Sequence, residues 1–190
     1  TSHEYHKVEV MDMEDLRPLV DEADIKNFRD RALSPERPVT RGTAENPETF
    51  FTHREACNAY YDAIPDVVEH YLGEISKITG REYHNFSYYG AEDAENIIIL
   101  MGSATEAARE AIDHLVAEGK KVGMVAVHLY RPFSIKHLFA AVPATVKKIA
   151  VLDRTKEPGA EGEPLYLDVK SAYYDQENRP VIVGGRYGLG

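Results

Sequence analysis

The chain has 190 residues and a formal net charge of −10 at pH 7, and 43% of its residues are hydrophobic. This length suits one ordinary domain with its own core, or one domain and part of another. An acidic balance without any block of Lys or Arg excludes a protein that binds the phosphate backbone of nucleic acids. There is no run of 18 apolar residues, so the sequence predicts no membrane span.

The cysteine usage points to a reducing compartment. Cys57 is the one cysteine of the chain, so it cannot form an internal disulfide or hold an iron–sulfur cluster, which needs several thiolates. A cytoplasmic location follows as the expectation. We interpret Cys57 as a buried structural thiol on a helix. The chain starts at Thr1 without a signal-peptide pattern and stops in Gly188-Leu189-Gly190, and we interpret it as a piece of a longer polypeptide.

The first fifty residues are predicted to form short elements and a long connection. Residues 7–10 alternate with period two and predict a strand, after which Asp12 caps a short helix. Three apolar residues at spacings of three to five predict a second helix: Ile25, Phe28 and Leu33. Residues 34–52 contain three prolines and predict an irregular strap between two domains.

From His53 onwards the pattern predicts an amphipathic helix that ends at Gly80. Its apolar residues recur every three or four positions: Tyr60, Ile64, Val67, Tyr71, Ile75 and Ile78. Pro65 interrupts this pattern and predicts a kink or a break into two helices.

The rest of the chain alternates between strands and helices. Four strands are predicted, at residues 96–101, 121–129, 148–153 and 180–183. Ser103 and Glu106 form a capping box before the first helix, and Ser134 opens the second. A third helix follows the loop at 157–164, with Leu165, Val169 and Ala172 on its apolar face. Repeated strand–helix units predict a three-layer α/β domain with a mostly parallel sheet, preceded by a strand and helix segment from a neighbouring domain.

Charged residues follow two of the predicted strands, where open α/β sheets meet their ligands and partners. Asp153, Arg154 and Glu157 lie directly after the third strand. They either contact a neighbouring domain or form a local ion-pair network that orders the loop. Arg131 follows the second strand, where a guanidinium can hold an anion or another domain. A helix start led by Pro132 is the equal alternative there.

The glycine-rich stretches and the histidines predict no site. Gly102-Ser103 and residues 184–190 lack both the G-x-G-x-x-G and the P-loop pattern, so we interpret them as turns or linkers. His3, Glu4 and His6 do not form H-E-x-x-H and are expected on the surface. No Ser/His/Asp set, cysteine–histidine pair or metal cluster can be assembled.

Six stretches, in order and spacing, resemble pyruvate:ferredoxin (flavodoxin) oxidoreductase. They are residues 1–4 (TSHE), 37–47 (RPVTRGTAENP), 129–133 (LYRPF), 151–160 (VLDRTKEPGA), 164–169 (PLYLDV) and 185–190 (GRYGLG). The resemblance implies a large, cytoplasmic, usually dimeric enzyme that decarboxylates pyruvate on thiamine diphosphate with Mg and passes acetyl to coenzyme A. It also implies [4Fe-4S] clusters that carry electrons to ferredoxin or flavodoxin.

The resemblance further implies how the chain is divided. Residues 1–50 are expected to be the tail of the first, pyrimidine-binding domain plus a linker. Residues 51–190 are expected to be the second domain, similar to the carboxyl-terminal domain of transketolase. In the family the thiamine and cluster domains lie elsewhere, and this chain has one cysteine and no Gly-Asp-Gly motif.

We therefore expect a scaffold that is inactive alone, with no catalytic, cofactor-binding or metal-binding residue of its own. Its expected partners are other domains of the same polypeptide, through Arg131, Asp153, Arg154 and Glu157. Two alternatives stay open. One is a non-enzymatic α/β module that binds a small ligand, and the other is the same domain from another 2-oxoacid or transketolase-type thiamine enzyme.

Overall fold

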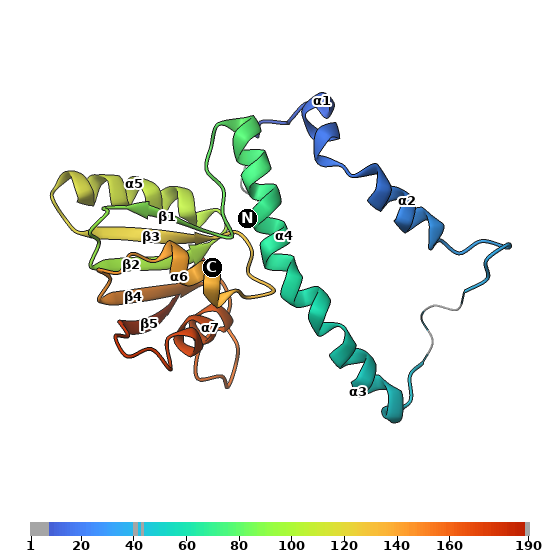
Figure 1. Ribbon diagram of the computed structural model, residues 1–190. Coiled ribbons are helices and arrows are strands. Elements are labelled where there is room, and N and C mark those ends of the chain that lie inside the picture. The colour runs from blue at the N-terminus through green and yellow to red at the C-terminus, as the bar shows by residue number, and fades with distance from the viewer. Residues whose placement is uncertain (1–7, 40–41, 43, 189–190) are drawn as a thin grey trace. The chain divides into compact units, whose positions relative to one another are not determined.

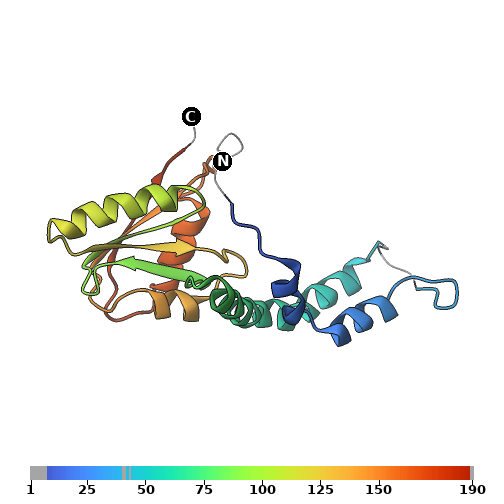
Figure 2. The same cartoon turned by 90° about the horizontal axis from the view of Figure 1, so that it is seen from above.

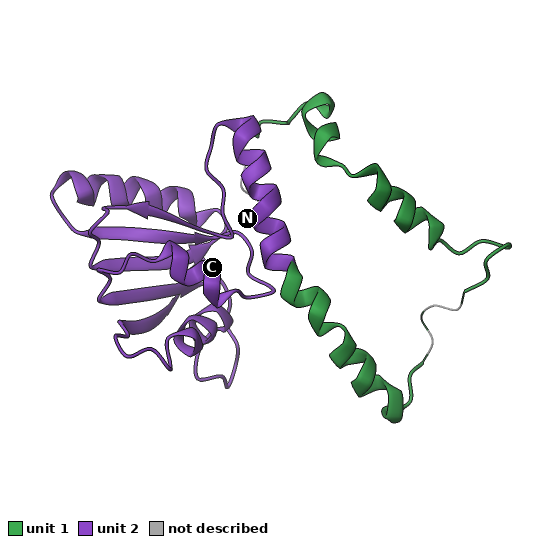
Figure 3. Ribbon diagram, in the orientation of Figure 1, with its two compact units in different colours: residues 1–63 green, residues 64–190 purple. Residues whose placement is uncertain are grey.

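The structure, a computed structural model, describes residues 8–39, 42 and 44–188 (Figure 1). Contacts within the chain divide it into two units, residues 1–63 and residues 64–190 (Figure 3). The division at residue 50 drawn from the sequence stays a prediction about domains of a longer protein. The predicted surface histidines His3 and His6 lie outside the described residues.

The first unit is built from short helices. They are α1 (Met13–Leu16), the 3₁₀ helix η1 (Arg17–Leu19), α2 (Glu22–Asp30), α3 (Pro47–Ala56) and the start of α4 (Asn58–Thr79). None of its described residues is buried. This unit therefore has no hydrophobic core of its own within the described part of the chain.

Three expectations for this unit are corrected. Val8–Val10 do not form a strand within the described residues. The helix α2 ends at Asp30, so Leu33 lies beyond it. The irregular connection ends at Asn46, because Pro47 occupies the first position of α3, where its missing N–H costs nothing. Asp12 occupies the N-cap position of α1, as predicted, but its side chain makes no capping hydrogen bond.

The break in the long helical region also lies elsewhere than predicted. The helix α4 runs through Pro65, and the interruption falls at Cys57, between α3 and α4. The Pro65 carbonyl accepts a hydrogen bond of 2.8 Å from Asn85 Nδ2. Cys57 is half-buried and its Sγ donates to the His53 carbonyl at 3.3 Å, so the buried thiol is a wrong prediction.

The second unit contains a five-stranded sheet in the order β1-β3-β2-β4-β5. The strands are β1 (Phe86–Gly90), β2 (Asn96–Met101), β3 (Val122–Val127), β4 (Lys148–Asp153) and β5 (Val181–Arg186). β1 pairs antiparallel with β3 and the other pairs are parallel, which confirms the mostly parallel sheet.

Helices cover both faces of this sheet and confirm the three-layer α/β architecture (Figures 1 and 2). On one face, α5 (Ala104–Ala117) packs Ile112 against Leu100, Met124 and Ala126. On the other, α6 (Ile135–Ala141) and α7 (Pro164–Ala172) bury the larger core. That core includes Leu138, Leu165 and Val169, together with Ile99 and Val151 of the sheet.

Two local predictions in the second unit are wrong. Ser103 has helical φ and ψ of −61° and −23° and makes no side-chain cap, so the capping box with Glu106 is absent. Gly184 and Gly185 belong to β5 instead of a turn. The ring of Tyr166 lies against Gly184 so closely that a Cβ there would be 2.9 Å from its Cγ, which explains a glycine inside a strand.

Candidate functional site

The carboxyl ends of β3, β4 and β5 bring six charged or phenolic residues together beside the start of α7. We call them the strand-end cluster: Tyr130, Arg131, Asp153, Glu163, Asp168 and Arg186. Parallel strands place their carboxyl ends at one edge of the sheet, so residues far apart in the sequence meet there. Sequence reasoning named Arg131 and Asp153 among them, and missed the other four as site residues.

Asp153 links β4 to α7 from a buried position. Asp153 is only 3% exposed. Its two carboxylate oxygens accept hydrogen bonds from the N–H groups of Leu165 and Tyr166 at 3.0 and 3.1 Å. These N–H groups belong to the first turn of α7, which has no partners for them within the helix. Burial raises the pKa of Asp153, and the two hydrogen bonds oppose that rise. Its direct role is therefore to anchor the helix.

Arg131 lies at the outer rim of the cluster. Its Nη2 is 2.6 Å from Asp168 Oδ2, and its guanidinium lies 4.2 Å from the centre of the Tyr130 ring. The Tyr130 hydroxyl donates to the same Asp168 oxygen at 2.9 Å. Burial, and then the Asp168 hydrogen bond, raise the pKa of Tyr130, so this phenol remains a donor at neutral pH. The Arg131 side chain is 54% exposed and can still reach a partner.

The loop after β4 is ordered from inside by Glu163. This carboxylate accepts the Glu157 N–H at 2.8 Å and also binds Arg186 Nε. Arg154 Nε donates to the Gly188 carbonyl at 3.3 Å. These hydrogen bonds and the ion pair form a local network that orders the loop, which is one of the two interpretations drawn from the sequence. Arg154 and Glu157 are nevertheless exposed, and their role as contacts to another domain stays a prediction.

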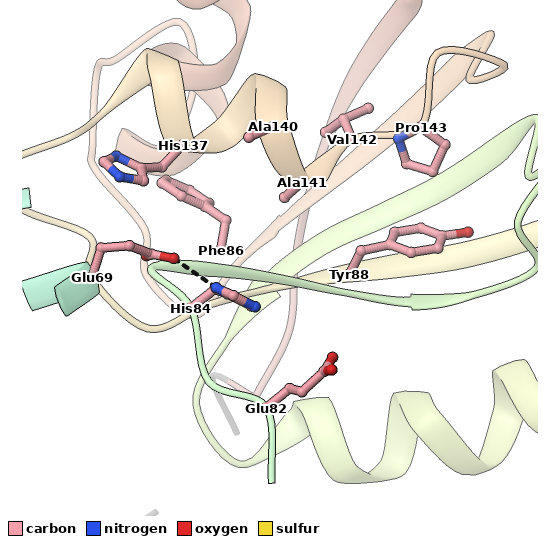
Figure 4. A pocket seen from close by; sticks show the side chains of 10 residues that line it. All are labelled: Glu69, Glu82, His84, Phe86, Tyr88, His137, Ala140, Ala141, Val142 and Pro143. Atoms are coloured by element: carbon pink, nitrogen blue, oxygen red, sulfur yellow. Dashed lines mark hydrogen bonds and ion pairs between the residues drawn. The ribbon is translucent and has the colours of Figure 1, made fainter. Parts of the chain in front are cut away.

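A half-open pocket of about 580 Å³ lies between α4, β1 and α6 (Figure 4). Glu69 of α4 accepts the Asn85 N–H at 2.9 Å, and its other oxygen lies 2.6 Å from His84 Nδ1. Phe86 and His137 also line the pocket. Sequence reasoning missed this pocket because it missed β1, which positions His84 and Asn85.

The pocket carboxylate predicts a pH-dependent contribution to stability. Burial alone would raise the pKa of Glu69, but the Asn85 N–H and His84 hold this pKa below its ordinary value. A carboxylate of this kind stabilises the fold above its unfolded pKa, and that contribution is lost as the pH falls through the folded pKa. Glu69→Gln should thus cost about 1 kcal/mol at neutral pH, because charged hydrogen bonds are replaced by neutral ones.

Urea unfolding of wild type and Glu69→Gln at several pH values measures this effect. The difference in unfolding free energy should shrink as the pH falls below about 4.5, the ordinary pKa of a glutamate. Glu82→Gln, an exposed carboxylate of the same pocket, is the matched control and should change little at any pH. A difference for Glu69→Gln that stays constant with pH would contradict the prediction.

The described residues do not fit a metal cofactor. Across residues 8–39, 42 and 44–188, no group of three or more His, Cys, Asp or Glu side chains could hold a metal ion. The same part of the chain holds no helix of the length and apolar character that a bilayer crossing requires.

Two family profiles match the chain. The profile described as "Pyruvate:ferredoxin oxidoreductase core domain II" matches residues 94–189. The profile described as "Pyruvate flavodoxin/ferredoxin oxidoreductase, thiamine diP-bdg" matches residues 1–72.

Curated relatives match over the whole chain. A pyruvate-flavodoxin oxidoreductase from Enterobacter agglomerans is 59% identical over 190 residues, which is 100% of this chain and 16% of that protein. A pyruvate:ferredoxin oxidoreductase from Moorella thermoacetica is 51% identical, with the same coverage. The chain thus spans about a sixth of these relatives.

Among solved structures, a 2-oxoglutarate:ferredoxin oxidoreductase from Magnetococcus marinus, with 2-oxoglutarate, coenzyme A and succinyl-CoA bound, is similar to the chain at 23% identity. The TM-score is 0.46, over 78% of this chain and 22% of that one.

Proposed function

Because the chain belongs to the pyruvate:ferredoxin (flavodoxin) oxidoreductase family, we propose that it is part of an enzyme that converts pyruvate and coenzyme A into acetyl-CoA and CO₂. The observation that carries this proposal is the 59% identity over all 190 residues with a pyruvate-flavodoxin oxidoreductase. Within that enzyme, the chain acts as a scaffold without the catalytic centre.

The cofactors and partners of this proposal belong to the parent enzyme. Thiamine diphosphate, Mg and [4Fe-4S] clusters are held outside these residues, and the electrons pass to ferredoxin or flavodoxin. The parent enzyme is a cytoplasmic homodimer. The family profile over residues 1–72 carries thiamine diphosphate in its description, which supports the thiamine part of the proposal.

The test compares the full-length enzyme with the isolated chain. The full-length protein should be brown and should reduce flavodoxin, ferredoxin or a viologen dye only when both pyruvate and coenzyme A are present. The isolated chain should reduce none of these acceptors under the same conditions. A full-length protein without pyruvate-dependent reduction, or with activity on another 2-oxo acid instead, would overturn the proposed substrate.

The strand-end cluster is proposed to position a neighbouring domain. Arg131 is the more exposed of the two cations of this cluster, with 54% of its side chain exposed against 43% for Arg186, and it is held in place by Asp168 and by the Tyr130 ring. A residue fixed in this way loses little side-chain entropy when a partner binds. Contacts of this kind position an active site from outside it, and misplacement by about 1 Å can cost a large factor in rate.

Arg131→Ala in the full-length enzyme should lower turnover or dimer yield about tenfold, which corresponds to about 1.4 kcal/mol of lost contact. Glu157→Ala should act in the same direction. Arg179→Ala is the matched control, because Arg179 is exposed and bonds only the Tyr174 carbonyl at 3.1 Å among the contacts described, before the amino end of β5. Unchanged assembly and turnover in both Arg131→Ala and Glu157→Ala would contradict the proposed contact with a neighbouring domain.

The pocket beside β1 supports a second candidate, a module that binds a small ligand without catalysis. Its volume suits a small molecule, and it combines carboxylates with an aromatic floor. Saturable binding of a metabolite to the isolated chain, lost in Glu69→Gln, would favour this candidate. A colourless native protein of 21.4 kDa would favour it as well.

A further inference from the structure

On the face of the sheet that α5 covers, no helix of the described residues covers β4 and β5. Side chains alternate between the two faces along a strand, and Ile149, Val151 and Ile182 face the α6–α7 core. The register pairs Ala150 with Val183, so both point to the α5 side. Yet α5 contacts β1, β2 and β3, whereas α7 covers β4 and β5 on the opposite face.

Two valines of β5 are much more exposed than is usual for a strand of a parallel sheet. Val181 is 63% exposed and Val183 is 53% exposed, whereas Ile149 on the other face of β4 is fully buried. Strands of parallel sheets are covered by helices on both faces. This part of the sheet therefore lacks half of its cover within the described residues.

An apolar groove of about 400 Å³ follows this open surface beside α5. Ile98, Ala150 and Val183 form its floor, and Ala108, Ala111 and Leu115 of α5 form its wall. These six side chains carry no polar group, and the polar residues of the lining, Asn96 and Lys148, lie at the amino ends of β2 and β4. The floor and wall of the groove therefore suit an apolar partner better than a polar metabolite. The alanines also let a neighbouring backbone approach closely.

The dimensions of the groove suit one α-helix. Its floor spans three neighbouring strands, β2, β4 and β5, each about 4.8 Å from the next, and a helix with its side chains is about 10 Å across. A helix placed there would pack on β4 and β5 below and on α5 at its side. A helix antiparallel to the strands, as α5 is, would end near Lys148 at the amino end of β4. A cation at that position complements the negative carboxyl end of a helix.

We propose that this groove seats an amphipathic helix of the same polypeptide, contributed by a part of the parent protein outside residues 1–190. The inference rests on the proposed function, in which the chain is a piece of a longer enzyme. The relatives are long enough to contain such a helix elsewhere, because the region matched by this chain is 16% of their length. The helix completes the α5 layer and fixes the scaffold domain to the rest of the enzyme.

Cysteine labelling in the full-length enzyme tests whether the groove is covered. Val183→Cys should react with a maleimide at least tenfold more slowly than Val116→Cys, followed peptide by peptide with mass spectrometry. Val116 is the matched control, because it lies on α5 outside the groove and is 36% exposed. With an open groove, the more exposed position 183 would react as fast as position 116 or faster, and the proposal would fail.

A photoreactive residue identifies the occupant. Lys148→benzoylphenylalanine places the probe at the exposed end of the groove, where a bulky side chain is tolerated. The expected product is a crosslink to a peptide outside residues 1–190 that migrates with the mass of one subunit. Crosslinks to a second subunit, to residues 1–190 or to a foreign protein would each overturn the proposal, as would the absence of any crosslink.

The same preparation separates this inference from the function on which it rests. Pyruvate-dependent reduction of flavodoxin is measured on the wild-type enzyme before labelling. An active enzyme with a freely labelled position 183 overturns the seated helix alone. A protein with a protected position 183 and no pyruvate-dependent activity overturns the proposed function alone.

Discussion

Replacing Asp153 with alanine is expected to lower the free energy of unfolding by about 2 kcal/mol. The variant removes two hydrogen bonds at once, those from the N–H groups of Leu165 and Tyr166. Loss of a helix cap costs about 1 kcal/mol in typical cases, and buried N–H groups left without partners add to that cost. Urea unfolding of the chain, followed by circular dichroism, measures the difference.

The pH dependence of Asp153→Ala should run opposite to that of Glu69→Gln. Burial raises the pKa of Asp153 above its ordinary value of 3.8. A group of this kind contributes its full stability below its unfolded pKa and loses part of it as the pH rises through the folded pKa. The difference between wild type and Asp153→Ala should therefore widen between about pH 7 and pH 4.

Two further variants make the Asp153 test specific. Asp153→Asn keeps one oxygen acceptor and should lose less stability than Asp153→Ala. Asp175→Ala, at an exposed position after α7, is the matched control and should change the unfolding free energy by less than about 0.5 kcal/mol. Equal effects of Asp153→Ala and Asp175→Ala would show that the cap of α7 contributes nothing measurable.

The sequence predicts the second unit better than the first, because its elements are marked by local patterns. The buried strands β2 and β4 are continuous apolar runs, and the predicted bounds of both agree with the structure. Ser134 precedes α6 and caps it, as predicted. In contrast, β1 reads Phe-Ser-Tyr-Tyr-Gly, which is neither an apolar run nor a regular alternation. It becomes a strand through its pairing with β3, which the local sequence does not encode.

For the strand-end cluster, too, the sequence predicts what depends on neighbouring residues and misses what depends on contacts between distant ones. The positions of Arg131 and Asp153 at strand ends could be predicted, since each follows an apolar run. The partners could not, because Asp168, which pairs with Arg131, comes from α7. The second ion pair joins Glu163, directly before α7, to Arg186 at the end of β5. An interpretation of residues 184–190 as a turn or linker gives no reason to pair Arg186 with Glu163. Only the folded sheet brings these charges together.

Val183→Asp is expected to be strongly destabilising in the full-length enzyme, although Val183 is 53% exposed in the chain described here. If a helix covers the groove, the new carboxylate loses its water in a lining that is mainly apolar, with Ile98 and Ala150 beside it on the floor and the polar residues only at the amino ends of the strands. An isolated buried charge of this kind costs about 3 kcal/mol or more. In an open groove the same change would cost about 1 kcal/mol, the usual range of strand propensities.

Hydrogen exchange of the β4 and β5 peptides in the full-length enzyme distinguishes the two cases. Destabilisation by about 3 kcal/mol should speed exchange of these amides by more than a hundredfold, whereas about 1 kcal/mol changes it by less than tenfold. Val116→Asp introduces the same charge on α5, outside the groove, and should leave β4 and β5 protected. A small effect of Val183→Asp, equal to that of Val116→Asp, would mean that water reaches β5 in the assembled enzyme. The strand-end contacts would then have to hold this domain in place without a helix on its open face.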